Sequence, residues 1–336
     1  MTDGTDAAVV RELLSPLAIF LADKSLYEVI INRPGEILTE GPNGWQVYDT
    51  PDLTFEKLMR LARAIATFSN QSIDEKRPIL SATLPDDERI QIVIPPATTN
   101  GTVSITIRKP SSVDFALSDL EEKGFFSETT GAGVISVGTR ERELAELYQK
   151  GAFMQFLREA VIARKNIVIS GATGSAKTTL CKALIKHIPE NERVISIEDT
   201  PELVIAQPNH VRLYYSKGGQ GLSGAGPREL LESCLRMRPD RILLQELRDG
   251  TAFYYIRNVN SGHPGSITTV HAGSTELAFE QLATLVKESE AGRDLDRTEV
   301  LTSLRIAIDI IVQCKRIDGA FRATEIYYLD AASDGI

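Results

Sequence analysis

The chain has 336 residues, 42% of them hydrophobic, and a net charge of −9 at pH 7. This length allows about two domains of roughly 150 residues each, and the acidic balance argues against a protein coated for nucleic acid. No uninterrupted apolar run approaches the roughly 18 to 20 residues of a membrane-spanning helix, and the acidic start "MTDGTDAAVVREL" lacks the basic region of a secretory signal. We therefore expect a cytoplasmic protein without an integral membrane segment, which can still work at a membrane by docking to partners.

Residues 1–125 predict an α+β domain. A helix with apolar residues at helical spacing opens the chain and is expected to kink at Pro16. Strand-like pieces follow, "LYEVIIN", "EILTE" and "WQVY", with turns at "RPGE" and "GPNG". A second amphipathic helix is predicted over 55–68. The segments "RIQIVIP" and "VSITIRK" alternate strictly and predict an antiparallel pair of strands.

Residues 126–150 predict a connection and residues 151–336 an α/β domain. The stretch 126–139 is rich in Gly, Ser and Thr, and the charged helix "RERELAELYQKG" follows it. Helical stretches then alternate with the apolar strands "NIVIS", "RVISIE", "RILLQE" and "GSITTV", as in a sheet covered by helices on both faces. The segments "AIDIIVQC" and "FRATEIYYL" predict an antiparallel extension. Three scattered cysteines, Cys181, Cys234 and Cys314, are expected to be reduced core thiols.

Residues 171–179, "GATGSAKTT", lie between an apolar strand and a helix and nearly match the phosphate-binding pattern G-x-x-x-x-G-K-[ST]. Backbone N–H groups at the start of such a helix point at phosphate oxygens, and the helix dipole favours negative charge there. Lys177 would reach the β- and γ-phosphates, and the Thr178 hydroxyl would ligate Mg²⁺. The alternative is a Gly/Ser-rich turn that happens to precede a helix.

Ala176 replaces the second glycine of this pattern. Glycine is required where φ is positive or where a Cβ has no room, whereas alanine is acceptable where φ is already helical. We therefore predict a negative φ at Ala176, which leaves Gly171 and Gly174 to take any left-handed backbone angles.

Carboxylates follow two of the predicted strands. Glu198 and Asp199 end the strand in "RVISIEDTPEL", where they could polarise water or bind Mg²⁺ through water, or could serve as a helix cap or exposed turn. Glu246 ends the strand in "RILLQELRDG", the expected position for metal coordination or water activation. Arg248 follows it and could contact phosphate or hold Glu246. The usual aspartate of that strand end is missing.

Two further segments are ambiguous. In "SGHPGSITTVHAGS", His263 and His271 lie on either side of a strand without the spacing of a metal site, and His271 is either structural or a sensor of the γ-phosphate. The string "GQGLSG" at 219–224 matches G-x-G-x-x-G, but it belongs to the longer tract "SKGGQGLSGAG" and favours a mobile surface loop over a dinucleotide fingerprint.

Together these segments resemble the secretion ATPases, in particular the traffic ATPases of type IV secretion and conjugation systems. "GATGSAKTT" looks like their Walker A motif, "ISIEDTPEL" their Asp box, "LRMRPDRILLQELR" their Walker B motif and "SGHPGSITTVHA" their His box. The N-terminal segments "EVIINRPGEI", "LPDDERIQIVIPP" and "SITIRKPS" are similar to the N-terminal domain of that family. The resemblance covers nearly the whole chain, and its specificity lies in four boxes in one order.

The resemblance implies a RecA-like P-loop ATPase domain with a smaller α+β N-terminal domain, a ring of six subunits, and ATP bound between the two domains. It also implies that Lys177, Thr178, Glu198, Glu246 and His271 line the ATP site. Arg108, together with Arg89, projects from the N-terminal strands, and in this family such arginines reach the nucleotide and neutralise charge. Their alternative is an ordinary solvent-facing arginine on a sheet. Ala176 and Gln245 depart from glycines usual in the family; the first puts the turnover rate in doubt more than binding, and the second has no interpretation from the sequence.

We predict from this a cytoplasmic, hexameric, Mg²⁺-dependent ATPase that powers type IV secretion or conjugative transfer and pilus assembly at the inner membrane. Its partners would be secretion-channel and coupling-ATPase components, with a secreted protein or DNA–protein substrate moved indirectly. The predicted catalytic residues are Glu198, Glu246, Lys177, His271 and Arg108. The predicted nucleotide-binding residues are Gly171, Thr173, Gly174, Ser175, Ala176, Lys177, Thr178, Thr179, Arg89 and Arg248, and the predicted Mg²⁺ ligands are Thr178 and Glu246, directly or through water.

Three alternatives to this function stay open at the level of the sequence. The first is a motor ATPase of a type IV pilus or of type II secretion. Three scattered cysteines cannot build the tetracysteine zinc module of many assembly motors, but retraction motors lack that module as well. The second is a RecA-like nucleic-acid helicase, against which the acidic balance weighs. The third is a non-hydrolysing assembly subunit, which Ala176 keeps open.

Overall fold

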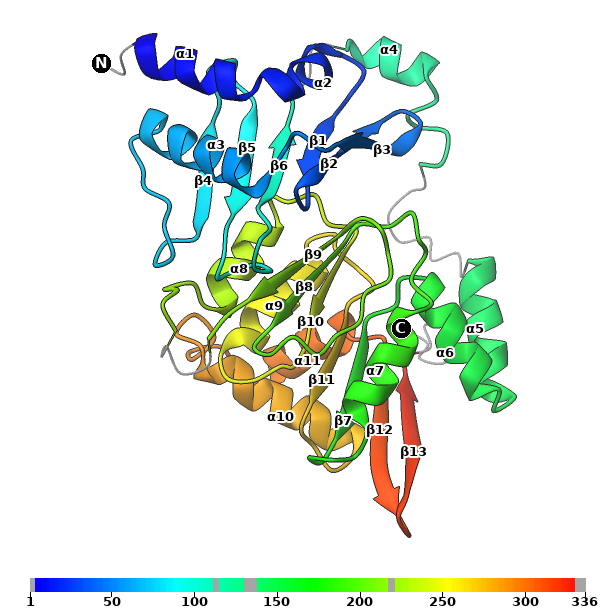
Figure 1. Cartoon of the computed structure of the whole chain (residues 1–336). Helices are drawn as coiled ribbons and strands as arrows, with labels where there is room; N and C mark the ends of the chain where they lie inside the picture. Colours follow the sequence, from blue (N-terminus) through cyan, green and yellow to red (C-terminus); the bar gives the residue numbers. More distant parts are fainter. Residues whose placement is uncertain (1–3, 111–114, 130–137, 217–220, 330–336) are drawn as a thin grey trace.

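The computed structural model describes residues 4–110, 115–129, 138–216 and 221–329. An α+β domain and an α/β domain, connected by helices, make up these residues (Figure 1). The predicted fold class is therefore confirmed, while the proposed division at 125/126 and 150/151 stays a prediction.

The first helical segment breaks where Pro16 stands, as its sequence predicts. Helix α1 covers Gly4–Leu13, the 3-10 helix η1 covers Ser15–Leu17 and helix α2 covers Ala18–Ala22. Proline lacks the N–H that would continue the helical hydrogen bonds, which explains the break. Helix α3, Phe55–Phe68, has the predicted bounds, and its N-cap Thr54 accepts a hydrogen bond from the Lys57 N–H at 3.4 Å.

The N-terminal sheet is antiparallel and has the order β3-β2-β1-β6-β5-β4. Its strands are β1 (Glu28–Ile31), β2 (Gly35–Gly41), β3 (Gly44–Thr50), β4 (Ile79–Thr83), β5 (Arg89–Val93) and β6 (Ser104–Arg108). Strands β5 and β6 are the predicted antiparallel pair, with Ile92 opposite Ile105. Their alternating isoleucines pack with α1 and α3 in one core, so the strict alternation marks the face that the helices cover (Figure 1).

Three helices connect the two sheets. They are α4 (Leu117–Glu122), α5 (Thr139–Gln149) and α6 (Phe153–Ile162). Helix α5 is the charged helix that the sequence predicts. The predicted linker at 126–139 lies largely outside the described residues, because 130–137 are not among them.

The second domain is built on parallel strands. They are β7 (Ile167–Gly171), β8 (Val194–Glu198), β9 (His210–Tyr214), β10 (Arg241–Leu244), β11 (Ile267–Val270) and β12 (Ile310–Ile317), and β13 (Ala320–Tyr328) adds antiparallel to β12. The order is β10-β8-β9 in one sheet and β11-β7-β12-β13 in the other. The Leu247 N–H, just beyond β10, donates to the Thr269 carbonyl of β11 at 2.8 Å and joins the two sheets. The predicted antiparallel extension is confirmed.

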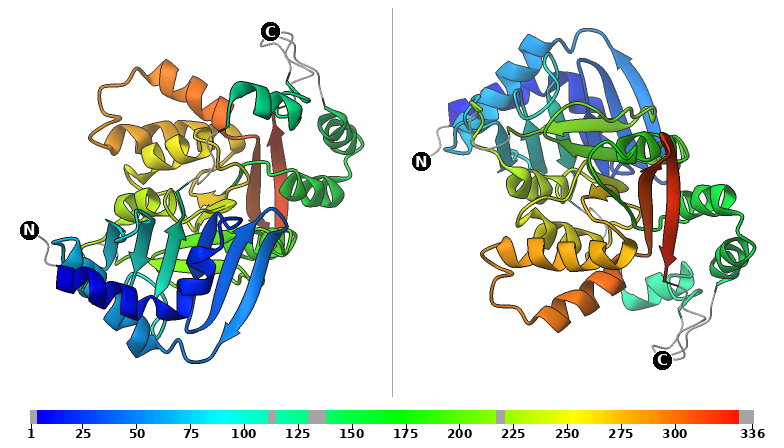
Figure 2. Two further views of the ribbon diagram at one scale, coloured as in Figure 1. Left: turned by 90° about the horizontal axis from the view of Figure 1, so that it is seen from above. Right: turned by 90° about the horizontal axis from the view of Figure 1, so that it is seen from below.

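Helices cover both faces of this combined sheet. They are α7 (Lys177–Ile185), α8 (Pro227–Cys234), α9 (Thr251–Asn260), α10 (Thr275–Glu288) and α11 (Arg297–Ala307). Residues of α8 to α11 form one core with the sheet, and residues of α5 to α7 form another (Figure 2). The three cysteines are free and buried in these cores, as predicted.

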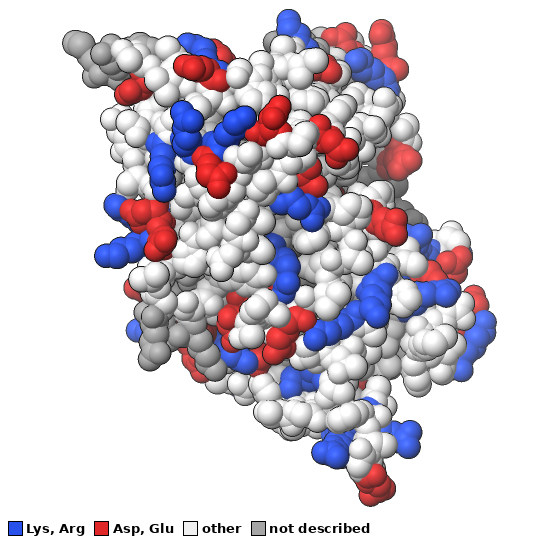
Figure 3. Space-filling model, in the orientation of Figure 1, with Lys and Arg blue, Asp and Glu red and all other residues white. Residues whose placement is uncertain are grey.

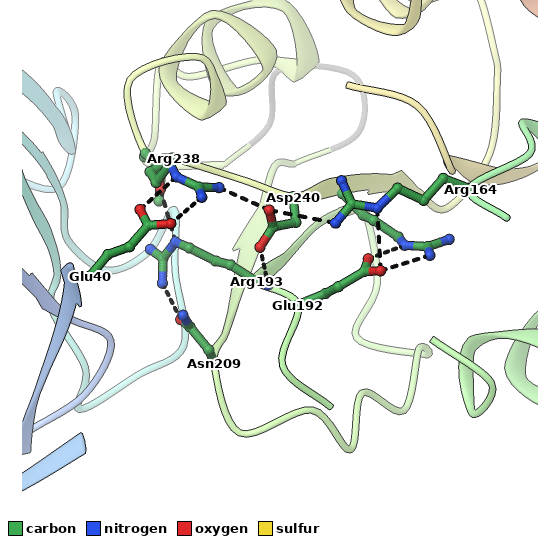
Figure 4. A network of polar contacts seen from close by, with 9 residues as sticks. Glu40, Arg164, Glu192, Arg193, Asn209, Arg238 and Asp240 are labelled. Carbon is green, nitrogen blue, oxygen red and sulfur yellow. Dashed lines mark hydrogen bonds and ion pairs between the residues drawn. The ribbon is translucent and has the colours of Figure 1, made fainter. Parts of the chain in front are cut away.

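The contact between the domains, which we call the domain joint, contains a fully buried arginine. Arg193, immediately before β8, has no exposed surface. Its guanidinium donates to Asn32 Oδ1 of the N-terminal domain at 2.7 Å, to the Met237 carbonyl at 2.8 Å and to Asn209 (Figure 4). Burial lowers the pKa of Arg193 to about 10, which still leaves it charged at pH 7. A buried charge is tolerated because these polar groups surround it.

A second ion pair and an apolar contact complete the domain joint. Arg238 pairs with Glu40 of β2 and with Asp240, at 2.9 Å in the latter case (Figure 4). Val93 and Ala97, from the N-terminal domain, are fully buried in the core of the second domain. The two domains therefore share apolar as well as polar contacts.

The surface has mixed charge. In the face drawn in Figure 3, acidic and basic side chains are interspersed, and the protruding β12–β13 hairpin carries basic side chains on both sides. Within the described part of the chain, no helix has the length and apolar character needed to cross a membrane.

Candidate active site

The loop between β7 and α7 has the shape of a phosphate-binding loop, with one correction to the sequence prediction. Gly171 and Gly174 take positive φ values of 156° and 71°, as expected. Ala176 also has a positive φ, 72°, so the predicted negative φ is wrong. The physical reason is that α7 begins only at Lys177. Ala176 is its N-cap and takes the left-handed conformation that turns the chain into the helix.

The loop is tightly packed at Gly171 and presents hydrogen-bond donors at the start of α7. A Cβ at Gly171 would overlap Ser175 Oγ and the Cys314 carbonyl oxygen, so only glycine fits there. No side chain caps the N-terminus of α7, and the first N–H groups of a helix have no partners within the helix. Thr173, Thr178 and Thr179 lie in the loop and the first turn of α7, and Thr173 and Thr179 are exposed. The local geometry therefore fits an anion at the start of α7.

The Lys177 ammonium is held inside the loop. Its Nζ donates to the carbonyl oxygens of Gly171 at 2.7 Å and Ala172 at 2.9 Å, and it lies 3.3 Å from His271 Nδ1. Burial lowers the pKa of Lys177, and the negative charge of Glu246 opposes that change. A partly desolvated cation with neutral partners is poised to exchange them for phosphate oxygens.

His271 connects the lysine to the carboxylate that follows β10. An ammonium group has no acceptor, so Nδ1 of His271 accepts from Lys177 and Nε2 carries the proton. Nε2 lies 2.9 Å from Glu246 Oε1. The structure thus brings together Lys177, His271 and Glu246, which the sequence assigns to three separate boxes.

Arg248 extends this chain of contacts to the end of β8. Its guanidinium pairs with Glu246 Oε2 on one side and with Asp199 Oδ2, at 2.9 Å, on the other. The hydrogen bond to Glu246 raises the pKa of Arg248. The sequence leaves two roles for Arg248, contact with phosphate or contact with Glu246. The structure shows the contact with Glu246.

Glu198 is fully buried, and both of its carboxylate oxygens are occupied. They accept from Ser196 Oγ, from the N–H groups of Glu202 and Leu203, and from Arg212 at 3.0 and 2.9 Å. Glu198 therefore fixes the segment that follows β8. The next element is β9, so Glu198 is not a helix cap, and its burial excludes an exposed turn. Its role at the nucleotide stays a prediction.

The two N-terminal arginines lie elsewhere in the chain. Arg89 and Arg108 are cross-strand neighbours on β5 and β6, and the Arg108 side chain is 73% exposed and 3.9 Å from Glu28. In Figure 1, β7 and β12 run away from the N-terminal domain, so the loop after β7 lies at the opposite end of the sheet. Within one chain, the structure does not bring these arginines to the loop.

One contributor, Arg212, escaped the sequence analysis, and another, Gln245, was noted there without an interpretation. Arg212 pairs with Glu198 from the neighbouring strand β9, and Gln245 contacts the backbone of Asp199. A charged residue inside the strand "HVRLYY" was a usable signal, because an arginine that is partly removed from water favours a carboxylate partner. No comparable signal exists for Gln245. The decoy "GQGLSG" falls partly on 217–220, outside the described residues, and β9 and α8 are not joined there by a tight turn.

The residues around the loop offer the groups that ATP and Mg²⁺ require. The start of α7 offers N–H groups, Lys177 offers an ammonium, and Thr178 and Glu246 offer oxygens, which are the groups that a nucleotide with Mg²⁺ requires. Among the described residues, no cluster of three or more His, Cys, Asp or Glu could hold a metal by itself.

The fold and these contacts define a P-loop secretion ATPase, and the chain belongs to the type II/IV secretion system protein family, whose model matches residues 13–329. Its relatives are proteins named VirB11. It is 58% identical to the type IV secretion system protein VirB11 of Bartonella henselae, over 98% of this chain and 95% of that protein. It is 45% identical to VirB11 of Brucella suis, over 96% and 91%.

A solved structure agrees with these relatives. The crystal structure of the VirB11 ATPase from the Brucella suis type IV secretion system, in complex with sulphate, matches with a TM-score of 0.91 and 44% identity, over 96% of this chain and 95% of that chain. The predicted type IV secretion ATPase is thereby confirmed, in preference to the pilus, type II and helicase alternatives.

Proposed function

We propose that the protein hydrolyses ATP to ADP and phosphate with Mg²⁺ and that this reaction powers transport through a type IV secretion system. The observation that carries the proposal is the continuous contact from Lys177 through His271 to Glu246. It unites a phosphate-binding cation, a residue able to sense the γ-phosphate and a carboxylate able to orient water. The sulphate in the Brucella suis relative supports an anion site in this fold.

In this proposal the loop and the start of α7 bind the phosphates. The N–H groups of Gly174, Lys177 and Thr178 would face them, and Lys177 exchanges the carbonyls of its own loop for phosphate oxygens. Mg²⁺, held by Thr178 and by Glu246 directly or through water, would neutralise charge on the phosphates. The loop thus changes its internal hydrogen bonds when nucleotide enters.

Glu246 is the residue that orients the attacking water. Arg248 pairs with its Oε2, while its Oε1 lies 2.9 Å from His271 Nε2 and has no hydrogen-bond partner among the described residues, so this oxygen is free to accept from a water. Glu198 contributes negative charge from the end of β8, and its five protein contacts leave the water to Glu246. Arg248 can leave Glu246 for a phosphate oxygen, since both are anionic partners.

Arg89 and Arg108 reach the nucleotide from a neighbouring subunit. Each chain directs its loop away from its own N-terminal domain, whereas Arg108 projects into solvent. A ring of six subunits would place the N-terminal domain of one chain over the loop of the next. Such heterologous contacts close into rings.

The same proposal gives the protein a place in the cell. It would act in the cytoplasm at the inner membrane, bound to channel and coupling-ATPase components, and move a secreted protein or DNA–protein substrate indirectly. The membership of the type II/IV secretion family and the likeness to VirB11 support this assignment.

Lys177→Ala tests the proposed reaction. Loss of the ammonium should reduce kcat for ATP by about 100-fold, because a donor to developing phosphate charge is removed. The measurement is phosphate release with Mg²⁺ and, separately, with excess EDTA, which should stop turnover of the wild type. Lys186→Ala, an exposed lysine directly after α7, is the matched control and should retain full activity. Full activity in Lys177→Ala would refute the site.

A further inference from the structure

Gln245 connects the ends of three neighbouring strands. Its N–H donates to the Ile197 carbonyl of β8 at 3.0 Å, and its carbonyl accepts from Thr269 Oγ1 of β11 at 3.0 Å. Its side chain makes a third contact, in which Oε1 accepts from the Asp199 N–H at 3.2 Å. The first two contacts suit any residue at the end of β10, but the third needs an acceptor on a long side chain.

The third contact fixes the residue that holds Arg248. Asp199 Oδ2 lies 2.9 Å from the Arg248 guanidinium, and the other end of that guanidinium pairs with Glu246. The side chains of Asp199 and Glu246 are 16% and 14% exposed, whereas that of Arg248 is 37% exposed, so the two carboxylates are shielded from water and the arginine is partly solvated. A shift of the backbone at Asp199 would therefore reach Glu246 through a single arginine.

We propose that Gln245 is a positioning residue, which sets the direction of the Glu246 carboxylate through Asp199 and Arg248. This inference rests on the proposed function, because it assigns a role in the reaction of that same site. Among the described residues, the side-chain amide of Gln245 has no hydrogen bond to Glu246. Within those residues, Gln245 also has no hydrogen bond to the loop at 171–179. Its effect is thus transmitted, and it is not a catalytic residue.

The length and the charge of the side chain both matter. Leucine would leave the Asp199 N–H without this acceptor, and asparagine is one methylene shorter than glutamine. Glutamate keeps the acceptor and the reach, although it adds a charge beside the Asp199–Arg248 pair. These three residues therefore separate reach from polarity.

The test compares Gln245→Leu, Gln245→Asn and Gln245→Glu in steady-state ATP hydrolysis by the full chain. We expect Leu and Asn to lower kcat by roughly 10-fold, the effect typical of outer residues that orient a functional group. KM should change by less than about twofold, since binding of ATP is untouched. Gln245→Glu should recover most of kcat. Gln281→Leu on α10 is the matched control for the Leu exchange.

A double-mutant cycle with Asp199→Ala identifies the route. If Gln245 acts through Asp199, adding Gln245→Asn to Asp199→Ala should lower kcat no further. Wild-type kcat in both Leu and Asn variants, or multiplicative losses in the cycle, would overturn the inference. If Gln245→Leu does not fold, the kcat of Gln245→Asn and the double-mutant cycle still test whether Gln245 acts through Asp199. A wild-type protein without ATPase activity would instead overturn the proposed function.

Discussion

A single backbone angle sets the character of the phosphate loop. Ala176 has a φ of 72°, although an L-residue in the left-handed region is strained by roughly 1–2 kcal/mol. Glycine there would remove the strain, but it would also make the unfolded chain more flexible at a cost of about 0.4–1 kcal/mol. The loop of this chain therefore carries strain next to the phosphates.

Ala176→Gly should stabilise the protein by up to about 1 kcal/mol and should tighten ATP binding, because the loop no longer resists its own turn. Ala176→Val should abolish binding, since a β-branched residue at positive φ is an outlier. Thermal unfolding and ATP titration measure both effects. Asp318→Gly, at a φ of 50° in the β12–β13 turn, controls for a general effect of glycine. Weaker binding in Ala176→Gly would contradict this account.

At this scale the sequence identified the residue types but not the contacts. The lysine, threonine, histidine and carboxylates follow strand ends, and the parallel order of those strands brings their side chains together. The angle at Ala176 depends on whether α7 begins at 176 or 177. Patterns place helix ends only to within one or two residues, which is too coarse for that question.

The central strand of the N-terminal sheet contains a carboxylate in an unfavourable place. Glu28 of β1 lies between Glu40 of β2 and Arg108 of β6, and its side chain is 7% exposed. Burial raises its pKa from 4.5 to about 7, and Arg108 opposes that change. Glu28 Oε2 has no hydrogen-bond partner in the part of the chain that the structure describes.

Glu28→Gln should therefore stabilise the protein in a pH-dependent way. Below pH 4.5 the wild-type carboxyl is protonated in both the folded and the unfolded chain, so it does not reduce the free energy of unfolding. Between pH 4.5 and about 7 the unfolded chain ionises first, and wild-type stability falls with rising pH. Above pH 7 the gain of the variant should be largest, at most about 3 kcal/mol. Urea unfolding at pH 5 and pH 8 measures it, with the exposed Glu12→Gln as control; an equal gain at both values would contradict the assignment.

Strands with strict alternation were predictable from the sequence, and short polar ones were not. The isoleucines of β5 and β6 recur at every second position because one face packs on α1 and α3. Strand β4, Ile79–Thr83, contains only two large apolar residues and lies at the sheet edge, so its sequence carries no such period. The helix at 55–68 was predictable because its apolar stripe is complete.

The whole molecule separates the arginines from the loop that they are proposed to serve. Strand β6, which ends at Arg108, belongs to the N-terminal domain, and the loop between β7 and α7, which precedes Lys177, lies at the end of the second domain that faces away from it (Figure 1). Only an assembly can bring the two together. No periodicity in a single chain reports on that geometry, which is why the sequence could suggest the participants but not the chain that supplies them.

Mixed rings test this arrangement. Lys177→Ala chains keep Arg108, and Arg108→Ala chains keep the loop, so each variant alone should be inactive. In an equal mixture, about a quarter of the contacts would join an intact loop to an intact arginine, if chains associate at random in a heterologous ring. ATPase activity near a quarter of the wild-type rate is expected. An inactive mixture would show that the arginine does not act from a neighbouring chain, and activity in Arg108→Ala alone would show that it is dispensable.

The domain joint constrains how this chain can be recombined. Arg193 is sealed between the domains, with Asn32 on one side and Asn209 on the other, and Val93 fills a core that belongs to the opposite half. Consider a hybrid that takes its first domain from one relative and its second domain from another. Its domain joint is mismatched unless both domains carry the residues that contact each other across the joint. The unit that can be exchanged intact is accordingly the pair of domains. Substitutions in the N-terminal domain are best tolerated on surfaces away from the domain joint.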